Sequence, residues 1–313
     1  MTLTRRMVVD PNDAGSYQPG IEQLGQPDKG GGPMKSVEIV TDSAASLTDE
    51  MRQKHEIAVV PIWVQIGGRA YKDGVDLPPD HFYASMDGPD MPTTSSPSPN
   101  EFVQVYREAA RRARDIISIH VTADGSATCQ VAAIAAESVP EASITVYDSK
   151  GVSMGIGFLA IEAAKAAMQG LRKDEIIARL DSLRSSMHTF VAIPTLKYLL
   201  KSGRVRRGQA ILASILSIKP VLEVKDGMVK VVDHVRTFSN AVNRILDLAA
   251  GAAGNVPSVV AIMHANARAQ AEALAVRVRA RLNVKDVMIG EAGPALAVHG
   301  GPGMIGIIMY TEK

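Results

Sequence analysis

The stretch DIISIHVTADGSATCQVAAIAAESVPEASITVYD, residues 115–148, joins two short β-rich runs through one alanine-rich run. Residues 115–121 predict a strand, a turn follows at Gly125-Ser126, residues 127–137 predict a helix, and residues 143–147 predict a second strand. Strand, helix and strand in this order form the repeating unit of a parallel sheet. The stretch therefore predicts an α/β fold.

Flanking segments extend the same alternation. Residues 37–41 predict a strand, residues 42–46 the turn that opens a helix, and residues 153–169 a long helix of small residues. Residues 57–65 predict another strand, which leads into a hairpin centred on two glycines. Ser98 as N-cap, Pro99 and Glu101 together predict the start of a helix. Up to about residue 187, the chain therefore predicts a mostly parallel sheet with flanking helices.

The second half has a different pattern. Residues 221–232 predict a hairpin with Asp226-Gly227 at its turn. Two helices (239–250 and 267–282), a strand (258–264) and a closing apolar pair follow, and the first member of that pair, residues 295–299, places His299 at a strand end. We therefore expect two α/β domains, an N-terminal one at 35–187 and a C-terminal one at 188–313 with a mixed sheet. Residues 1–34, rich in Gly, Pro, Asp and Gln, predict a flexible extension.

Composition excludes several classes of protein. The 313 residues carry a net charge of +1 and only 4% aromatic side chains, which argues against a general nucleic-acid binder. Cys129 stands alone, so no internal disulfide forms, and the histidines lack zinc-ligand spacing. The most apolar helical run is interrupted by Glu162 and Lys165 and is too short to cross a bilayer. We expect a cytoplasmic protein without a metal or stable membrane insertion.

Three polar features are candidates for chemistry. Residues 92–99, PTTSSPSP, hold more hydroxyls than helix capping needs, and they form either an anion-binding loop or a solvated linker. Ser126 precedes a helix, as an ordinary cap or as a donor to an oxyanion. His299 adjoins the run Gly300-Gly-Pro-Gly303, where it is structural or functional. Cys129 has no base beside it in the sequence, which favours a buried, unreactive thiol.

A basic tract lies within this neutral chain. Residues 182–222 contain no Asp or Glu but contain several Lys and Arg, most of them at 197–207. Such a tract is either a solvated positive surface or a docking patch for an acidic partner.

Seven motifs in one order resemble the DegV family over residues 36–313. They are Thr41-Asp-Ser43, Thr94-Ser-Ser-Pro-Ser98, Ser126-Ala-Thr-Cys-Gln130, Asp148-Ser-Lys-Gly-Val-Ser-Met-Gly155, Tyr198-Leu-Leu-Lys-Ser-Gly-Arg-Val205, Ile218-Lys-Pro-Val-Leu222 with Asp226-Gly227, and His299-Gly-Gly-Pro-Gly303. Two positions depart from the family pattern: Ser96 stands where many members have Gln, and Ala127 where Gly is usual.

The resemblance implies a function and assigns residues to it. Members bind one long-chain fatty acid, such as palmitate or oleate, in a tunnel between two α/β domains. Several present its carboxylate to a separate ATP-using fatty acid kinase subunit, which makes acyl phosphate for phospholipid synthesis. The resemblance assigns the carboxylate to Thr94, Ser126 and His299 and the coupling to the kinase to Arg236. It implies no catalytic residue in this chain and no cofactor besides the bound fatty acid.

Two other functions remain open at the level of sequence. A lipid esterase would use Ser126 as nucleophile and His299 as base, but it also needs an orienting carboxylate, and the G-x-S-x-G pattern is missing. A nucleotide-binding or DNA-regulatory module would use the glycine-rich run and the basic tract, which the near-neutral net charge disfavours.

Overall fold

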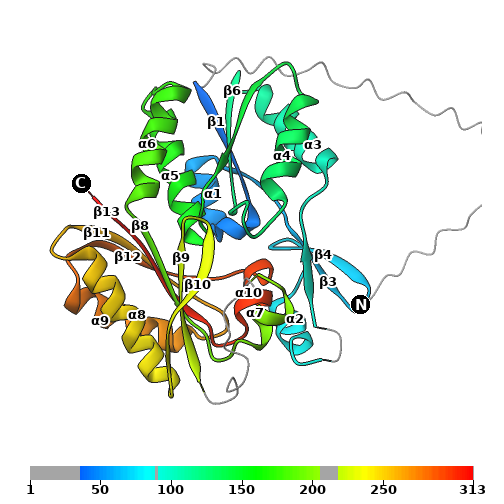
Figure 1. Ribbon diagram of the computed structural model, residues 1–313. Helices are drawn as coiled ribbons and strands as arrows, with labels where there is room; N and C mark the ends of the chain where they lie inside the picture. Colours follow the sequence, from blue (N-terminus) through cyan, green and yellow to red (C-terminus); the bar gives the residue numbers. More distant parts are fainter. Residues whose placement is uncertain (1–35, 89–90, 205–217, 313) are drawn as a thin grey trace, which may run out of the picture. The chain divides into compact units, whose positions relative to one another are not determined.

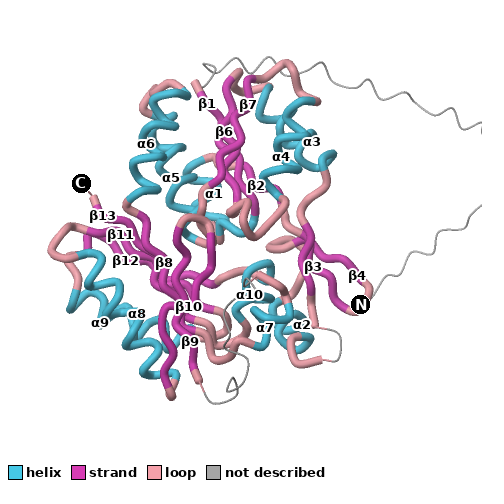
Figure 2. The backbone as a smooth tube through the Cα atoms, in the orientation of Figure 1, coloured by secondary structure: helices cyan, strands magenta, loops and turns pink. Residues whose placement is uncertain are grey.

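The computed structural model describes residues 36–88, 91–204 and 218–312, and the extension predicted at 1–34 lies outside them. Within these ranges the strands form a parallel sheet, a mixed sheet and a small antiparallel sheet (Figures 1 and 2). The fold is mixed α/β, as the sequence predicts. In the sequence, all strands of the parallel sheet precede residue 186 and all strands of the mixed sheet follow it. Helix α6 (Lys173–Ser185) ends just before this residue, and β8 (Met187–Ala192) begins just after it. The domain boundary at 187/188 stays a prediction.

The parallel sheet contains the predicted βα units. Its strands, in spatial order, are β2 (Ala58–Val60), β1 (Val37–Asp42), β6 (Asp115–His120) and β7 (Ser143–Asp148). Each neighbouring pair is parallel, and β1 aligns with β6 from Val37 opposite Asp115 to Thr41 opposite Ile119. Every residue of β1 is buried, as expected for a central strand covered on both faces.

Helices cover both faces of the parallel sheet (Figure 1). One face carries α5 (Met154–Met168) and α6, and the other carries α3 (Pro99–Ala110) and α4 (Thr128–Glu137). The predicted start of α3 is confirmed, because Ser98 and Glu101 form a reciprocal capping box. Helix α1 (Asp49–His55) begins after Thr48, whose side chain caps it. The predicted turn at 42–46 is therefore a separate 3-10 turn, η1 (Ser43–Ala45), and α1 opens only after it.

The mixed sheet confirms the predicted hairpin and the strand at 258–264. Its strands, in spatial order, are β10 (Met228–Val235), β9 (Lys219–Lys225), β8, β13 (Ile305–Thr311), β11 (Ser258–His264) and β12 (Val284–Glu291). All pairs are antiparallel except β11 with β12. Helices α8 (Phe238–Ala253) and α9 (Arg268–Arg281) cover one face. The β9–β10 turn uses positive φ at Asp226 and Gly227, which a two-residue turn requires.

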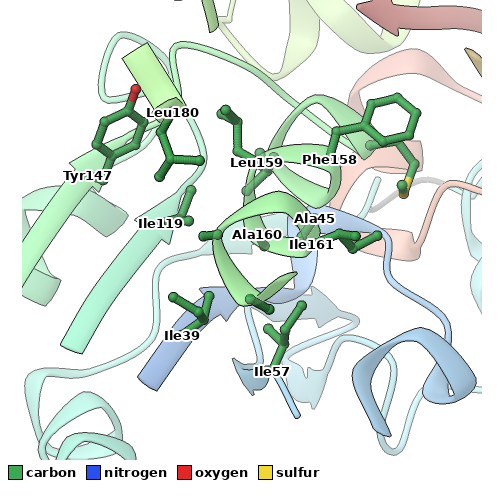
Figure 3. Packing of buried hydrophobic residues seen from close by; sticks show 14 of the residues in the cluster. Ile39, Ala45, Ile57, Ile119, Tyr147, Phe158, Leu159, Ala160, Ile161 and Leu180 are labelled. Carbon is green, nitrogen blue, oxygen red and sulfur yellow. The ribbon is translucent and has the colours of Figure 1, made fainter. Parts of the chain in front are cut away.

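Helix α5 packs against both large sheets, which explains its small residues. Ile39 and Ile119 of the parallel sheet lie against one side of α5, as Figure 3 shows. Phe158, on α5, meets the ring of Tyr310 in β13 edge to face, with centroids 5.2 Å apart. Because one helix serves two sheets, alanine and glycine along it allow close approach on several sides. The main core therefore joins the two sheets through α5.

The structure divides the strand predicted at 57–65. Its first part is β2, and its second part is β3 (Trp63–Ile66), the centre of the small sheet β4-β3-β5. Pro61 lies between them and has no backbone N–H to continue a ladder, so the chain leaves one sheet and enters another. The other strands are β4 (Arg69–Lys72) and β5 (Thr93–Ser95), and α2 (Pro79–Ser85) follows β4.

The strand predicted at 295–299 is wrong. Residues Pro294–Gly300 form helix α10, with Gly293 as N-cap and Pro294 at the first helical position. His299 therefore lies in the last turn of a helix instead of at a strand end. A second short helix, α7 (Lys197–Lys201), contacts α10. Strand β12 is an additional element that the sequence patterns did not indicate.

Candidate functional site

A cavity of about 810 Å³ lies between the loops that follow β1, β6 and β7, the strand β5, the mixed sheet, α7 and α10. Aliphatic side chains such as Ile62, Val152, Ile193, Leu222 and Ile308 form much of its wall. Hydroxyl groups and one imidazole form a polar part of the same wall, with Thr94, Ser126 and His299 among them. All three residues to which the family resemblance assigns the carboxylate therefore line this one cavity.

Thr94 reaches the cavity from the small antiparallel sheet. It lies in the middle of β5, where it pairs with Val64 of β3. Thr94 is half-buried, and its neighbours Ser95 and Ser96 also line the cavity. Ser98 instead caps α3, so the hydroxyl-rich run at 92–99 divides its groups between capping and the cavity wall. The interpretation of this run as only a solvated linker is excluded by that placement.

Ser126 lies just before α4, whose N-cap position is Ala127. Its hydroxyl lies 2.9 Å from the Thr128 hydroxyl, which donates in turn to Ser96 at 3.3 Å. The Ser126 N–H donates to the Thr122 carbonyl at 3.1 Å, which orders the loop after β6. A chain of hydroxyls therefore links the start of α4 to Ser96, directly after the strand that carries Thr94.

His299 enters the cavity from the end of α10. Its Nε2 lies 3.3 Å from the Thr94 hydroxyl. Its Nδ1 is buried, and no hydrogen-bond partner for that atom exists in the described part of the chain. Burial, and secondarily the positive charge of Arg204, lowers the pKa of His299 to about 3. The imidazole is therefore neutral at physiological pH, with one N–H to donate and one nitrogen to accept.

Arg204 is a cavity residue that the sequence patterns placed only in a surface tract. It lines the cavity, and its guanidinium donates to the Ser202 carbonyl at 2.6 Å. Lys197 of the same tract pairs with Asp87 at 3.3 Å, whereas Arg206 and Arg207 lie outside the described residues. The glycines and basic residues around Arg204 are equally typical of a cavity wall and of an exposed surface. Only the folded structure therefore shows that Arg204 lines the cavity.

Arg236 does not join this group. It follows β10, is exposed, and is absent from the cavity wall. Arg236 is therefore accessible from outside the cavity.

The tip of the β9–β10 hairpin closes against the loop that carries Ser126. The Thr122 hydroxyl donates to the Gly227 carbonyl at 3.0 Å. A Cβ atom at Gly227, whose φ is positive, would lie 2.5 Å from Asp124 Oδ2 and 2.6 Å from Thr122 Oγ1, so any other residue would be strained and would displace these side chains. Met228 and Lys230, which follow the tip, line the cavity. The two halves of the fold therefore meet directly beside the polar part of the wall.

The described residues do not form a hydrolytic triad. Ser126 contacts Thr128, His299 contacts Thr94, and no carboxylate orients His299 Nδ1 within the described ranges. Cys129 donates to the Val121 carbonyl, and burial raises the pKa of its thiol to about 12, as expected for an unreactive cysteine. Nothing in this geometry supports the esterase hypothesis.

Two negative findings apply to the described residues. No group of three or more His, Cys, Asp or Glu side chains in them is arranged to hold a metal ion. None of the helices in these ranges is both long enough and apolar enough to cross a membrane.

Known proteins resemble this chain along nearly its whole described length. A model of the DegV family, described as uncharacterised proteins, matches residues 36–312. A DegV domain-containing protein of Streptomyces coelicolor is 33% identical over 280 residues, 89% of this chain and 99% of that protein. A relative from Caldanaerobacter subterraneus is 31% identical over 281 residues, 90% of this chain and 100% of that protein.

Solved structures agree with these sequence matches. A DegV family protein from Thermus thermophilus, described by its fatty acid binding, has a TM-score of 0.84 and 31% identity, covering 89% of this chain and 100% of its own. DegV from Bacillus subtilis, a fatty acid binding protein, has a TM-score of 0.80 and 27% identity over the same shares. A stearic acid-binding protein from Eubacterium ventriosum has a TM-score of 0.81 and 27% identity, covering 88% and 98%.

Proposed function

This chain belongs to the DegV family, and on that premise we propose that it binds one long-chain fatty acid, such as palmitate or oleate, in the 810 Å³ cavity. The observation that carries the proposal is the composition of the wall, which is aliphatic over much of its extent and presents Thr94, Ser126 and His299 as a polar group. Similar solved structures are described as fatty acid binding proteins. The volume lies within the ~300–1,000 Å³ usual for small-molecule sites.

The carboxylate would bind at the polar group. Thr94 and His299 contact one another at 3.3 Å, which is long for a hydrogen bond to a hydroxyl. A carboxylate accepts shorter and stronger charge-assisted bonds, so it would take the place of this contact. Ser126 supplies a further hydroxyl, and a neutral His299 binds without forming a fixed ion pair. The head group would therefore be oriented yet remain chemically reactive.

The acyl tail would supply most of the binding energy. Burying a chain of about 16 carbons releases on the order of 12 kcal/mol gross at ~0.8 kcal/mol per methylene. Association costs ~4–15 kcal/mol, so the tail is needed to offset it. Met228, Met263 and Met304 line the cavity, and their flexible side chains can adapt to the shape of a tail. We therefore assign affinity to the tail and orientation to the polar group.

Native mass spectrometry of the purified protein tests lipid binding. We expect one co-purifying fatty acid per chain. Ser126→Ala and His299→Ala should retain less lipid, whereas Ser138→Ala, an exposed serine at the other end of α4, and His234→Ala, an exposed histidine on β10, serve as matched controls. A wild-type protein that carries no lipid and binds neither added palmitate nor added oleate would refute the proposal.

We further propose that the chain presents the bound carboxylate to a separate ATP-dependent kinase subunit. The exposed position of Arg236, away from the cavity wall, supports a role in contact with such a partner. Arg236→Ala should leave lipid retention unchanged and reduce acyl-phosphate formation by added fatty acid kinase subunit. Lys225→Ala removes an exposed cation of the same hairpin and serves as the control. An Arg236 variant that loses lipid as strongly as the Ser126 variant would contradict this division of roles.

A further inference from the structure

Asp73 is a buried carboxylate directly behind the cavity wall. It follows β4, and only 3% of its surface is exposed. It does not line the large cavity but borders a smaller one of about 240 Å³. The charged groups that share this smaller cavity are Asp42, Asp49, Arg52 and Glu291. A buried carboxylate is costly unless its hydrogen bonds are satisfied, so its partners indicate what it does.

The partners of Asp73 come from three separate elements. Its Oδ1 accepts a hydrogen bond from the Ala295 N–H at 3.2 Å, in the first turn of α10. The Ser43 side chain in η1 lines the same smaller cavity, and its interaction with the carboxylate lowers the pKa of Asp73. The Asp73 N–H donates to the Ile62 carbonyl at 2.9 Å, and the Ile62 N–H donates to the Ser43 hydroxyl at 3.0 Å. Asp73 thus joins η1, the segment before β3 and the start of α10.

The contact with α10 is a close one. A Cβ atom at Gly293, the N-cap of α10, would lie 3.0 Å from Asp73 Oδ1 and 3.3 Å from Oδ2. Few real Cβ contacts are this short, so the glycine allows the helix start to sit against the carboxylate. We call the bonds that Asp73 makes to these elements the clamp. Glycine at position 293 thus serves both as the N-cap of α10 and as the residue that leaves room for the clamp.

Asp73 is linked to both partners of the polar contact in the large cavity, to His299 through α10 and to Thr94 through the pairing of β3 with β5. His299 lies at the far end of α10, a helix of seven residues whose near end Asp73 holds. Thr94 pairs with Val64, two residues after Ile62. A short helix moves as a unit, so the position of its first turn sets the position of its last. Small displacements of such groups are costly to binding and reactivity.

We infer that Asp73 is a positioning residue that sets the separation between Thr94 and His299 through its hydrogen bonds to Ala295 and Ile62, with Ser43 beside it bonded to the same Ile62. The inference rests on the proposed function in that the ligand held between these two side chains is a fatty acid carboxylate. Asp73 touches no ligand itself. This role also involves Ser43 of the Thr41-Asp-Ser43 motif, because its hydroxyl accepts from the Ile62 N–H beside Asp73.

The test compares Asp73→Ala with Asp73→Asn in delipidated, histidine-labelled protein. An asparagine carbonyl can accept from Ala295 and its amide can donate to Ser43, so Asp73→Asn should preserve the clamp. Two quantities are measured: the NMR signals of the His299 ring, assigned with His299→Ala, and the Kd for a fluorescent fatty acid. Asp80→Ala, which removes an exposed carboxylate of α2, is the control.

We expect Asp73→Ala to shift the His299 signals and to raise Kd about tenfold, the effect of losing one or two buried hydrogen bonds. Asp73→Asn and Asp80→Ala should match the wild type in both. Unshifted His299 signals in Asp73→Ala, or equal shifts in Asp73→Asn, would overturn the inference. If Asp73→Ala does not fold, Ser43→Ala must shift the signals, and unchanged signals there would equally refute it. If even the wild type binds no fatty acid while Asp73→Ala shifts His299, the proposed function fails and the positioning role stands.

Discussion

Replacing Asp73 by Asn should change the pH dependence of stability in a way that the structure makes quantitative. Burial raises the pKa of Asp73 from 3.8 to about 6. The interactions with Ser43 and Ala295 lower this pKa, and the negative charge of Asp42 raises it further. Asparagine fills nearly the same space and does not titrate. The difference between the two proteins therefore isolates the ionisation of one buried carboxyl group.

The sign follows from linkage. The folded state holds the Asp73 proton more tightly than the unfolded state, so this group's contribution to stability is full below pH 3.8 and is lost as the pH rises through about 6. A shift of about two pKa units corresponds to about 3 kcal/mol. Between pH 4 and pH 7.5 the wild type loses most, but not all, of this roughly 3 kcal/mol, whereas Asp73→Asn loses none. The free energy of unfolding of Asp73→Asn minus that of the wild type should therefore rise by roughly 2 kcal/mol over this range.

Urea unfolding followed by circular dichroism, at half-unit steps from pH 4 to pH 8, measures this difference. Asp80→Asn, which removes an exposed carboxylate, controls for the change in net charge. Any offset at pH 4 reports the substitution itself, and only the change with pH reports ionisation. A difference that stays constant with pH, or that falls as the pH rises, would refute the assignment of a raised pKa to Asp73.

Three further outcomes test other parts of the fold. Gly227→Ala places a Cβ 2.5 Å from Asp124 Oδ2 at a residue with positive φ. The substitution should therefore lower the free energy of unfolding by about 1–3 kcal/mol and speed the release of bound lipid. An unaltered release rate would show that the hairpin tip does not help to close the cavity. Phe158→Ala removes a ring that is only 3% exposed and that contacts Tyr310. It should lower the free energy of unfolding, measured in urea, by about 3–5 kcal/mol. A loss below about 1 kcal/mol would contradict the packing of α5 on both sheets. The Cys129 thiol should resist iodoacetamide at pH 8 in the folded protein and react on unfolding, and rapid labelling of the native state would disprove its raised pKa.

The elements that sequence predicted correctly are those whose signals are local. The capping box of Ser98 and Glu101 lies within four residues, and the turn at Asp226-Gly227 depends on two backbone conformations. The alternation of strands and helices in residues 115–148 likewise reports each element separately. Such signals hold wherever the segment lies in the fold, so the α/β class follows from them.

The errors came where a distant partner overrides the local pattern. Pro61 gives no indication that the chain changes sheets there, since a proline also suits a strand edge. Residues 295–299 are apolar enough for a strand. The adjacent Gly293 and Pro294 are weak local signals for a helix start, and the distant Asp73 carboxylate supports it by accepting from the Ala295 N–H. Asp73 and Ala295 are 222 residues apart, and no local pattern relates them.

For the candidate site, sequence determined which residue types are present, and tertiary structure decided which of them meet. The hydroxyls at 94–96, Ser126 and His299 were recognisable as polar groups beside turns and helix starts, and the family motifs singled them out. That Thr94 and His299, 205 residues apart, share a hydrogen bond is a result of packing, as is the place of Arg204 in the cavity wall. The physical reason is that a side chain's type sets the bonds it can make, whereas burial and proximity depend on how whole sheets and helices pack together.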